Sequence, residues 1–175
     1  MKKKIIWIPL AVVVTACLAF YIYLQLQPKG FVKIDAAGAK MQLRGGQFSR
    51  TKTASSTGTV TLSTGTYRPQ HLQITTMQDG DTYQIESRGP WGKLEQTEVK
   101  ENQTTVLKLG PPFAIKPEAN QTSPQQVSIG LSITGQAGEQ YRNVVTKNNQ
   151  RVPAPKVKIV DEAGTAIAAG NFAYG

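Results

Sequence analysis

Gln126-Val127-Ser128-Ile129-Gly130-Leu131-Ser132-Ile133-Thr134 places an apolar side chain at every second position along its length. Because successive side chains of a strand point to opposite faces of a sheet, this alternation predicts a strand with one buried and one solvated face. Residues 71–75 and 82–86 repeat the pattern, with the turn residues Asp79-Gly80-Asp81 between them. Beyond residue 26 no segment has sustained helical spacing. The chain after its N-terminal segment is therefore predicted to be all-β, as one or two antiparallel β-sandwich units.

The paired prolines in Leu109-Gly110-Pro111-Pro112 suggest a boundary, because proline cannot continue the hydrogen-bond ladder of a sheet. We expect a first β-sandwich over residues 31–110 and a second, smaller β unit over residues 111–175. One sandwich continuing across the boundary is the alternative. Within the second unit, the proline-containing and polar residues 116–124 are predicted to form a loop.

The N-terminal segment begins with Lys2, Lys3 and Lys4 and continues from Ile5 to Leu24 without a charge. A helix of twenty residues is about 30 Å long, the thickness of the hydrocarbon core of a bilayer. We therefore expect a cytoplasmic head at residues 1–4, a single transmembrane helix over 5–24 that contacts the membrane, and a tether over 25–30. Residues 25–175 would then be extracytoplasmic, because a long downstream domain is translocated largely regardless of its charge.

Val14-Thr15-Ala16-Cys17 offers a different attachment, because it resembles the lipobox of bacterial lipoproteins. That resemblance implies lipidation of Cys17, although the apolar residues after Cys17 differ from the polar tether usual there. The alternative for Cys17 is a small side chain packed in a helix. Cleavage of the segment near Ala16 or Ala19 is a third interpretation.

Hairpin and turn patterns in the first unit resemble those of known envelope domains. They are Val32 to Gly38, Gly65-Thr66-Tyr67 before a strand, and the closing residues 99–109. These patterns resemble the carboxypeptidase-regulatory-like and prealbumin-like β-sandwich domains of bacterial envelope proteins. The resemblance implies an Ig-like or prealbumin-like sandwich with an accessory, non-catalytic role, and it carries over no site. Val157 to Gly164 echoes Val32 to Gly38, and both are predicted to form hairpins.

Composition excludes several classes of function. The formal net charge is +9 and the isoelectric point is near 9.7, but the basic residues outside the N-terminal cluster are scattered. We therefore predict no nucleic-acid partner and consider instead an acidic wall polymer, lipid headgroups or an envelope protein. Cys17 is the only cysteine and His71 the only histidine, so the sequence offers no internal disulfide, no multi-histidine metal site and no recognisable cofactor site.

No group of residues predicts catalysis. His71 lies in an alternating segment, where a strand residue on the polar face is expected, and the chain has no Gly-x-Ser-x-Gly element. Ser49-Arg50-Thr51-Lys52 matches Ser-x-x-Lys but lacks the helical setting that this motif needs. We expect no enzyme activity, no catalytic residue and no metal site.

The most plausible binding surface is the loop Arg88-Gly89-Pro90-Trp91-Gly92-Lys93. An exposed Trp91 could stack on a sugar ring while Arg88 and Lys93 hold acidic groups. The alternative is that Trp91 folds back over one end of the sandwich. The sequence thus predicts a non-catalytic binding or structural protein of the bacterial envelope, with wall-glycan binding through this loop, or a lipoprotein, as alternatives.

Overall fold

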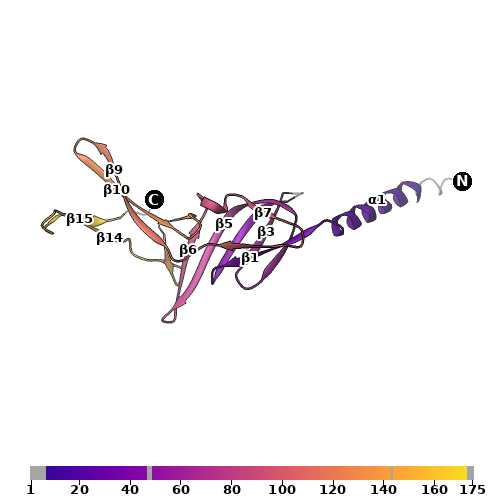
Figure 1. Cartoon of the computed structure of the whole chain (residues 1–175), viewed down its shortest axis with the longest axis horizontal. Helices are drawn as coiled ribbons and strands as arrows, with labels where there is room; N and C mark the ends of the chain where they lie inside the picture. The colour runs from indigo at the N-terminus through magenta and orange to yellow at the C-terminus, as the bar shows by residue number, and fades with distance from the viewer. Residues whose placement is uncertain (1–6, 47–48, 143, 173–175) are drawn as a thin grey trace.

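The computed structural model describes residues 7–46, 49–142 and 144–172, and β-strands follow one N-terminal helix (Figure 1). The helix is α1 (Trp7–Gln25), and a short 3₁₀ turn, η1, covers Gly92–Leu94. The strands are β1 (Lys29–Asp35), β2 (Ala39–Gly45), β3 (Arg50–Ser55), β4 (Thr59–Ser63), β5 (Gly65–Gln78), β6 (Asp81–Ser87), β7 (Thr97–Val99), β8 (Thr104–Lys108), β9 (Ala114–Ser123), β10 (Gln126–Thr134), β11 (Gln140–Tyr141), β12 (Thr146–Lys147), β13 (Gln150–Arg151), β14 (Lys156–Val160) and β15 (Ala166–Asn171). The prediction of an all-β chain after the helix is confirmed.

Helix α1 contains no charged residue, and its side chains from Val12 to Tyr23 are exposed. The predicted head at 1–4 and the first two residues of the predicted span lie outside the described residues. Among the described residues, no helix combines the length and the apolar character needed to cross a bilayer. The predicted transmembrane helix over 5–24 therefore gains no support from the structure. The predicted tether is shorter than 25–30, because β1 already begins at Lys29.

A smaller and a larger sheet enclose one hydrophobic core. The smaller sheet has the order β4-β1-β8, and the larger has the order β13-β12-β6-β5-β2-β3, with β7 also paired to β5. Buried side chains alternate with exposed ones along β1 and β2, as expected for strands with one face in a core. The core is lined from the smaller sheet by Val32, Ile34, Leu62 and Leu107, and from the larger by Ala39, Met41, Leu43, Leu72, Ile74 and Ile85.

The strand pairing departs from the prediction in two places. The predicted hairpin at residues 32–38 does not form, because both edges of β1 are occupied by β4 and β8, so β2 pairs with β3 and β5 in the other sheet. Gly38 makes the corner between the sheets with φ +68°, and a Cβ there would lie 1.8 Å from the carbonyl oxygen of Thr75. The second departure is that β1 and β8 are parallel. Parallel pairing needs a long connection, and here the connection between β1 and β8 contains strands of the larger sheet.

The two strands predicted in the middle of the chain, and the turn between them, are confirmed. Residues 71–75 lie in β5 and 82–86 in β6, and Asp79 and Gly80 form the two-residue turn between them with φ +52° and +83°. Two successive residues at positive φ are typical of the type I′ turn that suits the twist of a hairpin. Asn148 and Asn149 likewise join β12 to β13, with φ +50° and +64°.

Two hairpins project from the body at the end opposite α1 (Figure 1). The first is β9–β10, whose second strand has the bounds predicted from the alternation at 126–134. The prediction of a loop at 116–124 is wrong, because β9 pairs with β10 from Ala114 to Ser123. Pro117 is tolerated in this strand because β9 lies at the edge of its sheet. The second hairpin, β14–β15, matches the hairpin predicted around residues 157–164.

Residues on both sides of the predicted boundary at 110/111 share one sheet and one core. Strand β12 pairs with β6, so residues 146–151 extend the larger sheet. Ile133, Ala137 and Tyr141 are buried in the same cluster as the side chains of the first unit. The β9–β10 hairpin therefore begins on the body rather than on a separate linker.

Candidate functional site

The loop predicted as a binding surface is closed against another turn. Trp91 is only 7 % exposed and belongs to the core cluster, whereas Arg88 and Lys93 are exposed. The backbone N–H of Lys93 donates to the carbonyl oxygen of Ala137 at 2.8 Å, and Gln140 N–H donates to that of Pro90 at 2.8 Å. In this conformation the Trp91 ring is not offered to a ligand, and of the three predicted binding residues Arg88 and Lys93 face solvent.

The other singled-out residues lie far from this loop in the chain. Cys17 is exposed on α1. His71 is partly buried on β5, with its Nε2 3.3 Å from Glu86 Oε2 on the neighbouring strand β6. Within the described residues, no three His, Cys, Asp or Glu side chains gather closely enough to hold a metal ion.

A buried carboxylate that the sequence did not single out fixes the turn opposite Trp91. Glu139 is fully buried, and among the described residues its carboxylate accepts hydrogen bonds from Gly110 N–H at 2.6 Å, Ala137 N–H at 2.9 Å and the Tyr141 hydroxyl at 2.8 Å. Gln136 N–H adds a bond to the carbonyl oxygen of Gly110 at 3.1 Å. Burial, together with the hydrogen bond to Glu139, raises the pKa of Tyr141 well above its ordinary value. This junction ties the end of the first unit to the start of β11.

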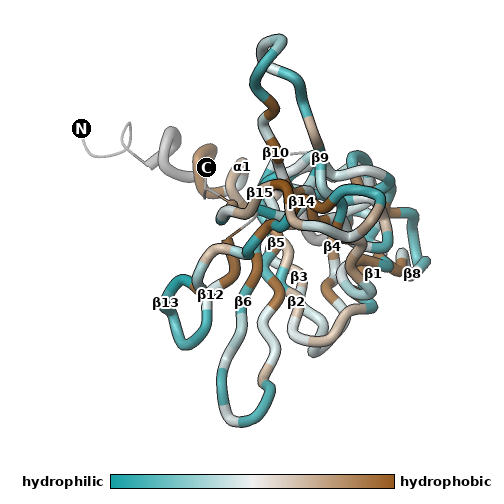
Figure 2. The backbone as a smooth tube through the Cα atoms, turned by 90° about the vertical axis from the view of Figure 1, so that its left-hand side faces the viewer, coloured by the Kyte–Doolittle hydropathy of each residue, from teal (hydrophilic) through white to brown (hydrophobic). Residues whose placement is uncertain are grey.

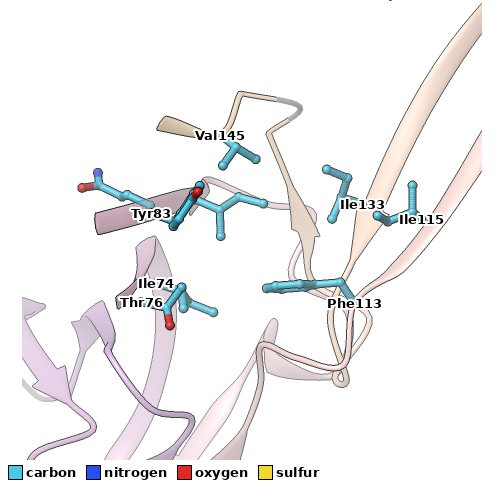
Figure 3. Close-up of a pocket in the computed structure, with 9 residues that line it drawn as sticks. Ile74, Thr76, Tyr83, Phe113, Ile115, Ile133 and Val145 are labelled. Atoms are coloured by element: carbon cyan, nitrogen blue, oxygen red, sulfur yellow. The ribbon is translucent and has the colours of Figure 1, made fainter. Parts of the chain in front are cut away.

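The candidate ligand site is a half-open cavity of about 190 Å³ between the larger sheet and the base of the β9–β10 hairpin (Figure 3). Its sheet wall includes two cross-strand pairs of β5 and β6, Ile74 with Ile85 and Thr76 with Tyr83, together with Gln84 of β6. The four residues of the two pairs share the sheet face that carries the core. Ile74, Ile85 and Ile133 belong to the core cluster, so the cavity is an open continuation of the core.

The opposite wall comes from residues distant in sequence. It consists of Phe113, Ile115, Ile133 and Val145 (Figure 3). Phe113 packs edge-on against the ring of Tyr141, with 5.1 Å between ring centroids and 75° between ring planes. In the described part of the chain no polar atom contributes to the lining. The cavity therefore offers dispersion contacts and no hydrogen-bonding group to a ligand.

A charge pair lies beside the Tyr83 wall. Lys147 Nζ is 5.8 Å from the centre of the Tyr83 ring and 2.6 Å from Asp81 Oδ2. Hydrogen bonds from Lys147 and Asn148 lower the pKa of Asp81, and the bond to Asp81 raises the pKa of Lys147. Both groups are thus charged over the ordinary pH range, and each neutralises the other.

The apolar surface continues from the cavity along the hairpin. Ile115 pairs with Ile133, Pro117 with Leu131, and Ala119 with Ile129, so one face of β9–β10 is apolar. The alternate pairs, which include Lys116 with Ser132, make the other face polar. Ile115 is 62 % exposed and Val127 is 57 % exposed. Figure 2 shows this hairpin projecting from the body with a hydrophilic tip.

No protein-family model, curated protein or solved structure matches this chain. Its geometry alone therefore bears on its function. The alternation at 126–134 did indicate that Ile133 would face an apolar layer, but no sequence signal places Phe113 and Val145 across from Ile74.

Proposed function

We propose that this chain is a non-catalytic binding or structural module of the bacterial cell envelope, attached to the membrane by its N-terminal segment and extracytoplasmic beyond it. As part of this proposal, we expect the fold to be of the carboxypeptidase-regulatory-like or prealbumin-like sandwich kind that the sequence resembles. The observation that carries it is the division of the molecule into two apolar ends separated by a closed core.

At one end, α1 exposes apolar side chains on all of its described faces, including Val12, Leu18, Phe20 and Ile22. A helix that is apolar all round is stable only when something apolar covers it, and removal of its surface from water provides the driving force. Lipid is the cover that fits an uncharged helix preceded by three lysines.

The β9–β10 hairpin lies at the end opposite α1 (Figure 1). This hairpin and the cavity at its base expose apolar surface. Exposed contiguous apolar surface of this kind marks binding sites on proteins. A module that is attached at one end and binds at the other fits an accessory role in the envelope.

Membrane fractionation tests the attachment. We expect the full-length chain to stay in the membrane pellet after carbonate extraction, and external protease to digest residues 25–175 in spheroplasts. Cys17→Ser distinguishes the two modes of attachment: retention of this variant supports attachment by the helix, and its release supports lipidation. Release of the wild-type chain by carbonate would refute membrane attachment of either kind.

A further inference from the structure

We infer that the cavity beneath the β9–β10 hairpin is a binding site for a small, uncharged ligand with a single ring or a hydrocarbon group of similar size. This inference specifies the ligand of the binding role proposed above. It does not depend on how the chain is attached to a membrane.

The size of the cavity sets the size of the ligand. Engineered apolar cavities of about 150 Å³ in other proteins stay dry and bind benzene or xenon. The present cavity of about 190 Å³ is slightly larger and is open on one side, so a single ring can enter without displacing the core.

The lining decides the polarity of the ligand. Ile74, Ile85 and Ile133 present only hydrocarbon, and no polar atom of the described residues reaches the cavity surface. A charged ligand would lose its hydration here without gaining a hydrogen bond or an ion pair, which costs several kcal/mol in general. Lys147, which lies 5.8 Å from the Tyr83 ring, is already paired with Asp81 at 2.6 Å and offers no net charge to an anion. The ligand is therefore neutral.

The walls of the cavity are also held in place without a ligand. The sheet wall belongs to paired strands, because β5 and β6 are in register through Ile74 and Ile85 and β12 extends β6 beside Tyr83. In the opposite wall, Ile115 and Ile133 are cross-strand partners, and Phe113 packs against the Tyr141 ring, whose hydroxyl donates to buried Glu139. Because both walls are held by contacts outside the cavity, the ligand meets a pre-formed space.

Methyl NMR on the full-length chain in lipid nanodiscs tests the inference, with benzene and toluene as neutral probes and benzoate as the charged one. Empty nanodiscs correct for partitioning of the probes into lipid. We expect saturable shifts of the methyl groups of Ile74, Ile85 and Ile133 with both neutral probes, and binding of benzoate at least tenfold weaker.

Two substitutions localise the binding. Val145→Phe fills the cavity and should weaken benzene binding at least tenfold; Thr76→Phe covers its rim from an exposed position and should do the same if Val145→Phe fails to fold. Val106→Phe, at an exposed position of β8 outside the cavity, is the matched control and should leave the dissociation constant unchanged.

Three outcomes would overturn the inference: no saturable shift with either neutral probe, equal binding by the two cavity variants and the wild type, or binding of a capped phenylalanine peptide without binding of benzene. The last outcome would assign the cavity to a side chain of a partner protein. A chain that is retained in membranes yet binds no probe would refute the ligand site alone, whereas a chain that binds probes but is released by carbonate would refute the attachment alone.

Discussion

Replacing Glu139 with glutamine should measurably destabilise the fold, because its carboxylate has no access to solvent. Two backbone N–H groups and the Tyr141 hydroxyl donate to it, with Gly110 and Tyr141 on Oε1 and Ala137 on Oε2. Glutamine is nearly isosteric, so Glu139→Gln changes hydrogen bonding and charge while leaving the packing intact.

The magnitude follows from these three bonds. If the glutamine carbonyl takes the place of Oε1, the bonds from Gly110 and Tyr141 persist without charge assistance, and the amide group faces Ala137 N–H, a donor opposite a donor. A buried donor left without an acceptor costs about 1–3 kcal/mol, and loss of charge assistance costs about 1 kcal/mol per bond. Relief of a buried charge offsets part of this cost. We expect a net loss of about 2 kcal/mol in the free energy of unfolding.

Urea unfolding followed by tryptophan fluorescence provides the measurement, since Trp91 lies in the core beside this junction. Glu118→Gln, on the exposed strand β9, is the matched control and should change the free energy by less than about 0.5 kcal/mol. Amide exchange at Gly110 and Ala137 should become faster in Glu139→Gln only. A loss below about 0.5 kcal/mol for Glu139→Gln, or exchange rates equal to those of the wild type, would show that the carboxylate does not hold the junction.

The other predictions concern the same body of the protein. The raised pKa of Tyr141 means that the unfolded chain loses this proton first, so the free energy of unfolding should fall as pH rises above about 10; a slope equally steep in Tyr141→Phe would contradict this. The lowered pKa of Asp81 means that its contribution to the free energy of unfolding is present at neutral pH and is lost as pH falls through and below about 3.8. At neutral pH, Asp81→Asn should speed amide exchange in β12, and unchanged exchange would show that the ion pair with Lys147 does not stabilise this strand. Gly92→Ala should lower the melting temperature by several degrees, because Gly92 has φ +56° and a Cβ would lie 2.4 Å from the carbonyl oxygen of Ala137; a thermal scan equal to that of the wild type would refute the close approach.

The sequence was most informative where structure is local. The period-two alternation located β10 at its observed bounds and placed strands at 71–75 and 82–86, because alternation is a direct consequence of strand geometry. It failed for β9, whose polar residues and Pro117 are typical of loops, because pairing with β10 outweighed local preference. The parallel pairing of β1 with β8 depends on contacts across about 70 residues, for which no local signal exists.

Most of the candidate site could not be predicted from the sequence either, because it depends on contacts between residues far apart in the chain. Its walls combine β5, β6, the segment after Pro112 and Val145, which only the folded chain brings together. Glu139 lies in a glycine-containing turn, where an acidic residue is ordinarily solvated, so its burial could not be foreseen. For Trp91 the sequence leaves two positions open, exposed or folded back over the sandwich, and in the structure the side chain is buried in the core.

The edge strands of the larger sheet affect how readily copies of the chain aggregate. One edge strand is β13, which is only two residues long, and the other is β3, where Arg50 and Lys52 are exposed. Long, flat and uncharged edge strands can pair with strands of neighbouring molecules and so start aggregation, whereas short or cationic edge strands discourage this pairing. At high local concentration, copies of this chain are therefore protected from edge-to-edge pairing of their larger sheets.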